Sequence, residues 1–129
     1  MRTELLHQGV KSSIHLIVEK ERSPEFVEFI KEIKRSSPLD NKKIIEYIAK
    51  FCEDPERFFK NKEKFRLLEY PIYEMKPTKQ IRLYVFEMEV NTWCITHGYI
   101  KKVDKNKQSQ SEIEKAKQYY NRWYDEYKQ

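Results

Sequence analysis

The spacing of the apolar residues changes twice along the chain, and this change limits the fold more than any other feature. Between residues 23 and 52, apolar side chains recur every three or four positions, as in an amphipathic helix. Between residues 70 and 97 they form short runs separated by turn residues, which is typical of strands. Beyond residue 109 the helical spacing returns. This order predicts helices packed on a sheet, in the α+β class.

The N-terminal half is expected to contain one strand and two helices. Residues 14–18 are mostly β-branched and predict a strand. A first helix is expected to begin with Ser23 as N-cap and Pro24 at the first helical position, and to end at residues 36–38. Asp40 is the expected N-cap of the second helix. The expected apolar stripes are Phe26, Phe29, Ile30 and Ile33 on the first helix and Ile44, Ile45, Ile48 and Cys52 on the second.

The C-terminal half is expected to be a meander followed by a helix. The sequence predicts strands at residues 70–75, 81–90 and 93–97, and strands joined by such short turns pair antiparallel. Ser109 and Glu112 have the spacing of a capping box at the start of the last helix. The predicted fold therefore has two N-terminal helices and a C-terminal helix packed on a twisted antiparallel sheet.

Length and composition indicate one domain without a metal. The 129 residues suit a single domain over 1–129, in which residues 1–13 are a candidate for a poorly ordered N-terminal extension. No apolar run reaches the length of a membrane span or of a signal peptide, so we expect a cytoplasmic protein without membrane contact. Cys52 and Cys94 are expected to be free thiols, and with His97 they do not supply the four ligands of a zinc site. No metal or other cofactor is expected.

The net charge of +5 arises from two segments of the chain. Residues 60–82 carry seven basic and three acidic side chains, and residues 101–107 carry four basic and one acidic. If the two segments meet in the fold, they form a cationic surface suited to phosphates. If they do not, they are two solvated loops. The charge pattern alone leaves both interpretations open.

Arg82 and His97 are the residues of the meander that could do chemistry. Arg82 stands within an apolar strand, so it either pairs with Glu74 or Glu87 or grips a phosphate. His97 ends the next strand, which would bring it near Arg82. RNA cleavage by its own 2′-OH needs a base, cations and an acid, and a histidine can serve as either base or acid. Alternatively, His97 is a packed core residue. Further cations and base-stacking rings are available from Lys76, Lys79, Lys101, Lys102, Tyr73, Tyr84 and Tyr99.

Four elements of the sequence resemble a family of toxins. They are residues 73–76, residues 81–86, residues 96–102 and the Glu112-Ile113 pair with Ala116. They are similar to the Tyr-Glu-Leu-Arg, Tyr-Arg-Val, His-Gly-Phe-x-Lys-Lys and Glu-Ile elements of type II toxin–antitoxin systems. The branch is the HigB-like, phage-associated part of the RelE/ParE superfamily, and the resemblance covers about residues 65–118.

The resemblance implies a RelE-like fold and ribosome-dependent cleavage of mRNA without a metal. It also implies a cognate antitoxin, often a helix-turn-helix protein, as partner. The positions that match the family's catalytic residues are Arg82, His97, Lys76 and Lys101, and the expected RNA-binding residues are Lys79, Lys102, Tyr84, Tyr99 and Lys105. Lys76 and Tyr99 replace an Arg and a Phe of the family pattern. Two alternatives are a ParE-like gyrase inhibitor and a non-catalytic binding module of the same fold.

Overall fold

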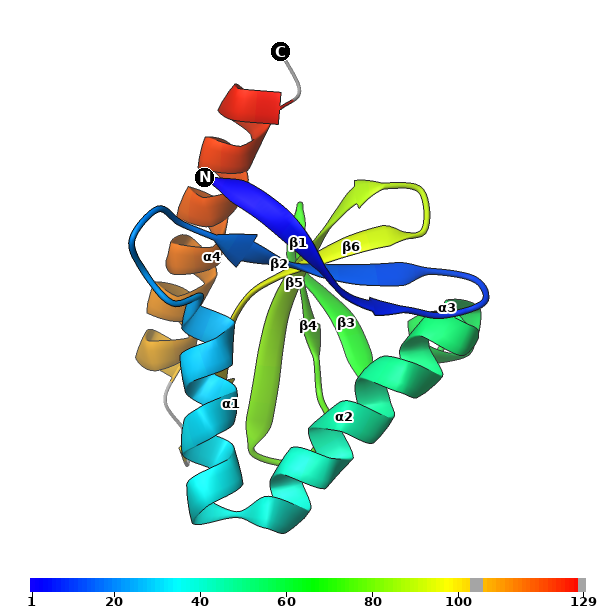
Figure 1. Ribbon diagram of the computed structural model, residues 1–129. Coiled ribbons are helices and arrows are strands. Elements are labelled where there is room, and N and C mark those ends of the chain that lie inside the picture. Colours follow the sequence, from blue (N-terminus) through cyan, green and yellow to red (C-terminus); the bar gives the residue numbers. More distant parts are fainter. Residues whose placement is uncertain (103–105, 128–129) are drawn as a thin grey trace.

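The computed structural model describes residues 1–102 and 106–127 of the chain. The described residues form six strands and four helices in one α+β fold (Figure 1). In chain order these elements are β1 (Arg2–Gln8), β2 (Ser13–Val18), α1 (Glu25–Ser36), α2 (Pro38–Glu53), α3 (Pro55–Phe59), β3 (Phe65–Glu69), β4 (Ile72–Met75), β5 (Ile81–Glu89), β6 (Thr92–Ile100) and α4 (Asn106–Tyr127).

The six strands form one mixed sheet in the order β1-β2-β6-β5-β4-β3. Strands β3 to β6 pair antiparallel, which confirms the predicted meander and adds β3 to its edge. Strand β2 runs parallel to β6, so the prediction of a wholly antiparallel sheet is wrong. A parallel neighbour requires a long connection, and the helices α1, α2 and α3 lie in the chain between β2 and the meander.

Both faces of the sheet are covered, and β5 is buried on both sides. Leu83 and Val85 belong to the core beneath α1 and α2, whereas Tyr84 and Phe86 belong to a second core beneath α4. Successive side chains of a strand point to opposite faces, so Arg82 shares the α4 face with Tyr84. The six residues 81–86 are therefore all buried, and only the end of the strand, at Glu87 and Glu89, is exposed.

The helices begin at other residues than the sequence predicts. Pro24 is the N-cap of α1 and makes no side-chain cap, and Ser37 caps α2 by accepting a hydrogen bond from the Asp40 amide at 3.4 Å. The hydroxyl of Ser37 stands at the end of α1, so one short turn ends the first helix and caps the second. Helix α4 begins at Asn106, which places Ser109 inside the helix instead of at its cap.

The buried stripe of α2 is shifted from the predicted one. Ile44, Ile48 and Cys52 are buried as expected, but Ile45 is 57% exposed. Tyr47 and Phe51 take the remaining buried positions, since a helix repeats every 3.6 residues and these two fall on the same face as Ile44. Their rings join an aromatic cluster with α3 and the sheet.

The first residues of the chain are part of the sheet. Strand β1 pairs antiparallel with β2, which corrects the expectation of a poorly ordered extension over residues 1–13. The amides of Lys11 and Ser12 both donate to the carbonyl of Cys52 at the end of α2. A Cβ at Gly9 would lie 2.6 Å from the backbone of Cys52, so only glycine permits this close approach.

Cys52 and Cys94 are both buried free thiols, as predicted. Burial raises the pKa of Cys52 to about 11 and raises that of Cys94 further. None of the helices in the described part of the chain is long and apolar enough to cross a membrane.

Candidate phosphate-binding site

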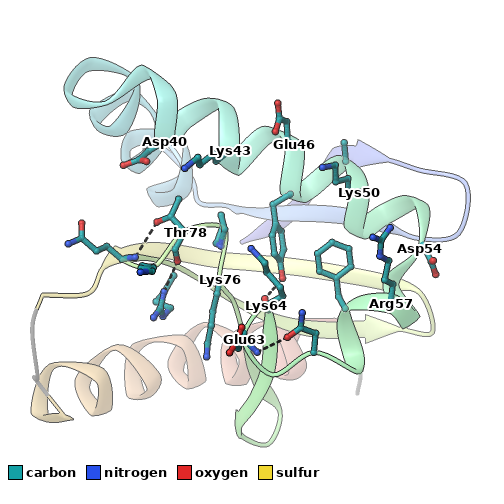
Figure 2. A pocket seen from close by; sticks show the side chains of 18 of the residues that line it. Asp40, Lys43, Glu46, Lys50, Asp54, Arg57, Glu63, Lys64, Lys76 and Thr78 are labelled. Atoms are coloured by element: carbon teal, nitrogen blue, oxygen red, sulfur yellow. Dashed lines mark hydrogen bonds between the residues drawn. The ribbon is translucent and has the colours of Figure 1, made fainter.

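A cleft of about 1390 Å³ lies between α2 and the turn that joins β4 to β5. Figure 2 looks into this cleft, with α2 on one side and the turn on the other. The α2 wall mixes charges, with Asp40 and Glu46 beside Lys43 and Lys50. The charged residues of the opposite wall, over residues 76–82, are all basic, namely Lys76, Lys79 and Arg82. The positive field of these residues favours an anion on that side of the cleft.

Arg82 is held at the wall of the cleft by the turn that precedes it. Its side chain is 11% exposed, and Nη1 donates hydrogen bonds to the carbonyl oxygens of Thr78 and Ile81, both at 3.0 Å. Its Nε is buried and has no hydrogen-bond partner within the described residues. Glu74 Oε2 lies 3.8 Å from Nε, which is an ion-pair distance but too long for a hydrogen bond. The backbone thus orients the guanidinium, and Nε itself is closed to an anion in the cleft.

Glu74 is the centre of a group of three cations. Its carboxylate is 5% exposed and accepts a hydrogen bond of 2.7 Å from Arg66 Nε. Lys76 Nζ lies 3.7 Å from one carboxylate oxygen and Arg82 Nε 3.8 Å from the other. Of the two partners predicted for Arg82, Glu74 is therefore the one observed, whereas Glu87 accepts from the Asn91 amide. Three cations around one carboxylate leave an excess of positive charge that attracts anions.

Lys76 and Lys101 bring the two basic segments of the chain together. The Lys101 amide donates to the Gln80 carbonyl at 2.6 Å, so the end of β6 lies against the β4–β5 turn. Burial lowers the pKa of Lys76, and the charges of Arg66, Arg82 and Lys101 lower it further, against the opposing effect of Glu74. Lys76 Nζ also donates to the carbonyl of Lys62 at 3.0 Å. The two segments do meet, and we call Arg66, Lys76, Arg82 and Lys101 the cationic group.

The remaining lysines predicted to bind RNA lie around this group or outside the described residues. Lys79 is exposed on the turn and lines the cleft. Lys102 is exposed directly after Lys101 and is absent from the cleft lining. Lys105 lies outside the described residues. The cations that line this wall of the cleft are thus Lys76, Lys79 and Arg82, whereas Arg66 and Lys101 of the cationic group are absent from the lining.

His97 is enclosed between the sheet and α4. The ring is fully buried, with Nδ1 2.9 Å from Thr96 Oγ1 and Nε2 2.9 Å from Glu112 Oε1. It stacks on Tyr84, with centroids 4.9 Å apart and an interplanar angle of 19°. His97 pairs with Tyr84 across the sheet and Arg82 pairs with Tyr99, so the two predicted residues are close along one face. The imidazole nevertheless faces Glu112 of α4 and is absent from the cleft lining, since α4 covers this part of the face.

The two tyrosines predicted to contact RNA belong to the α4 core. Tyr84 is 1% exposed, so it has no free ring face for a base, which corrects that prediction. Tyr99 is half-buried against the same core, where burial and the charge of Glu112 raise its pKa. Gly98, between His97 and Tyr99, faces α1, and a Cβ there would lie 2.3 Å from the ring of Phe29. Packing on both faces of the sheet thus accounts for the His-Gly-Tyr element. His97 and Tyr99 pack against α4 on one face, and Gly98 packs against α1 on the other.

Several residues of the site escaped the sequence analysis. Arg66 was counted among the basic residues of 60–82 but was not assigned a role. Its register partner in the β3–β4 pair is Glu74, and this cross-strand pair of opposite charges was the available signal. Basic residues of α2 and the following segment also line the cleft, namely Lys43, Lys50, Arg57 and Lys64. Helical spacing did not show which of these would face the sheet.

Comparisons with known proteins add no assignment to this geometry. No family model matches the chain, and no curated protein matches it. Over residues 1–102 and 106–127, no group of three or more His, Cys, Asp or Glu side chains is placed to hold a metal ion. Any assignment of function therefore rests on the residues of the site.

The burial of His97 leads to a prediction about stability. His97→Ala is expected to lower the free energy of unfolding by about 2 kcal/mol, because it leaves a cavity and removes the hydrogen bond to Glu112. Urea denaturation followed by circular dichroism measures this loss. His7→Ala, at a partly buried position of edge strand β1, is the matched control and should unfold close to the wild type. A His97→Ala protein of unchanged stability would contradict the structural role.

Proposed function

We propose that the protein is the toxin component of a type II toxin–antitoxin system and cleaves mRNA on the ribosome. The observation that carries the proposal is the position of Lys76 and Arg82 at the wall of an open cleft, with Arg82 oriented by two backbone carbonyls. A phosphodiester supplies the negative charge and the acceptor oxygens that this arrangement lacks. The resemblance described above points to the same residues.

The proposed chemistry is attack of the RNA 2′-oxygen on the adjacent phosphate. A base removes the 2′ proton, the bond from O2′ to phosphorus forms, and the bond from phosphorus to O5′ breaks. Lys76 is the candidate base, because its lowered pKa increases the fraction of neutral amine. Arg82 is the candidate ligand of the phosphate oxygens, where negative charge grows in the transition state. Lys101 is the candidate donor of the proton that O5′ takes up.

The order of the elements supports a RelE-like fold. Helices α1 and α2 precede the meander of β4, β5 and β6, and α4 follows it on the opposite face (Figure 1). This is the order that the resemblance implies. Strands β1 and β3 extend the sheet at its two edges. In this proposal a cognate antitoxin, of the helix-turn-helix type implied by the resemblance, neutralises the toxin.

One observation favours a second candidate, a binding module that keeps the fold without catalysis. His97, which the resemblance places in the catalytic set, is enclosed by α4 with both ring nitrogens occupied. Lys76 Nζ is itself engaged by the Lys62 carbonyl. In this second candidate the cationic group binds RNA and releases it uncut.

Induced expression separates these functions. The protein is produced with and without the product of the adjacent gene, and primer extension on an abundant message maps any cuts. Cuts that require translation and are suppressed by the neighbouring product support the proposal. Growth arrest without cuts would favour another target such as gyrase, and RNA binding without arrest would favour the binding module.

The assignment of Lys76 as base predicts the pH dependence of cleavage. The neutral amine is the active form, so the cleavage rate should rise with pH and level off above the Lys76 pKa, which lies below the ordinary lysine value of 10.5. Lys76→Arg should abolish this rise and lower the rate, because a guanidinium does not lose its proton in this range. Lys79→Arg, on the same wall of the cleft, is the control and should keep the wild-type profile. Single-turnover cleavage of a short RNA bound to ribosomes, measured across pH, provides the test.

A further inference from the structure

A second hollow lies beside the cationic group, and we infer that it holds one nucleobase of the bound RNA. This inference rests on the proposed function. The hollow has a volume of about 630 Å³, which is the size of a site for a small ligand. We call it the aromatic slot. Its lining consists of Phe59, Lys62, Phe65, Arg66, Leu67, Tyr73, Glu87 and Trp93.

Four aromatic rings that form one connected cluster make up most of the apolar part of the slot. The centroids of Phe65 and Tyr73 are 5.4 Å apart with nearly parallel planes, and Trp93 stands edge-on to both. Phe59 lies 5.3 Å from Phe65 and is 44% exposed. A nucleobase can stack on such an exposed ring whatever its identity, because every base has a π-face.

The slot also contains polar groups that suit a base better than an aliphatic side chain. Trp93 is 2% exposed, and its indole Nε1 is buried without a hydrogen-bond partner in the part of the chain described. This N–H has no surface open to the slot, so a base reaches it only if the Trp93 ring shifts on binding. Glu87 supplies a carboxylate in the lining that can accept from an exocyclic amine.

The slot is continuous with the cationic group through two basic residues. Arg66 lines the slot and also hydrogen-bonds Glu74, around which Lys76 and Arg82 gather. Lys62 lines the slot, and its carbonyl accepts a hydrogen bond from Lys76 Nζ. A nucleotide whose phosphate lies against Arg66 can therefore place its base in the slot. This combination of positive charge and aromatic rings favours RNA over an apolar peptide as the occupant.

The two tryptophans of the chain permit a direct test. Trp123→Phe leaves Trp93 as the single tryptophan, so its fluorescence reports on the slot. We expect titration with a short single-stranded oligoribonucleotide to quench this fluorescence. Phe59→Ala in the same background should weaken binding at least about fivefold, which corresponds to the loss of one stacked base. Tyr124→Ala is the matched control, since Tyr124 is an aromatic residue of nearly equal exposure, 45%, on α4.

The outcomes separate the slot from the proposed function. Phe59→Leu keeps the apolar bulk without the π-face, so weakened binding in this variant as well excludes a mere folding defect. RNA affinity that Phe59 variants leave unchanged, with no quenching of Trp93, would overturn the slot. Growth arrest and RNA cuts that persist in those variants would leave the proposed function standing. An oligoribonucleotide that does not bind at all would overturn the slot and argue against RNA as the ligand of the cationic group.

Discussion

Arg82→Ala should abolish the growth arrest that the induced wild-type protein causes and reduce RNA cleavage about a hundredfold or more. The reason is that the Arg82 guanidinium, already oriented by two backbone carbonyls, loses no orientation freedom when it binds phosphate. The loss should appear mainly in the rate constant of cleavage, because the charge on the phosphate is greatest in the transition state. Primer extension in cells and single-turnover cleavage on ribosomes measure it.

Two variants show whether this loss comes from the guanidinium itself. Arg82→Lys keeps the charge without the planar fork, so it should recover only a small part of the activity. Arg35→Ala removes an exposed arginine of α1 that lines neither hollow and should behave as the wild type. Folding is checked by urea denaturation, and Glu74 still has Arg66 and Lys76 as partners in the Arg82 variants. Full growth arrest in both Arg82→Ala and Lys101→Ala would rule out the proposed catalytic site.

Glu74→Ala should cause the largest loss of stability of any single change at the site. It removes the carboxylate that Arg66, Lys76 and Arg82 share, and the side chains of the last two are only 16% and 11% exposed. Unpaired charges that are so little exposed to solvent are destabilising, and we expect the free energy of unfolding to fall by about 3 kcal/mol or more. Arg66 contributes less to this loss because it is 45% exposed and water screens its charge.

Glu74→Gln and Glu63→Ala complete this experiment. The glutamine keeps the shape and one acceptor of Glu74, so about half of the loss should remain. Glu63 is an exposed acid in the cleft lining, and its removal should leave the denaturation midpoint unchanged. Glu74→Gln should also shift the pH profile of cleavage to lower pH, since Glu74 is the group that raises the Lys76 pKa. Equal denaturation midpoints for the wild type and Glu74→Ala would contradict the central role of Glu74.

The meander was the most predictable part of the fold. The turn at residues 77–80 and the one around Asn91 separate apolar runs, and such runs pair with their neighbours in sequence. Strand β3 was missed because its exposed residues, such as Arg66 and Leu67, show no clear alternation. Strand β1 was missed for the same reason, since most of its residues are exposed at the edge of the sheet.

The candidate site was predictable in its charges and less so in its geometry. Arg82, Lys76 and Lys101 were named from the sequence. The structure places Arg82 and Lys76 beside Glu74, and Lys101 near enough to Lys76 to lower its pKa. The exposure of His97 could not be predicted, because strand register indicates which residues are neighbours but not which helix packs over them. The aromatic slot depends on Phe59, which comes from a short helix whose position no local pattern reveals.

By itself, the sequence determined the order of the three long helices and of the meander strands, which residues alternate on β5, and that the excess positive charge lies in two segments. These properties depend on neighbours within a few residues, so local periodicity and side-chain type are enough to specify them. Only the tertiary structure decided that α4 encloses His97 and Tyr84 while Arg82 reaches the cleft. That outcome depends on which apolar faces, far apart in the chain, bury one another, because removing apolar surface from water is the dominant and non-directional force in folding.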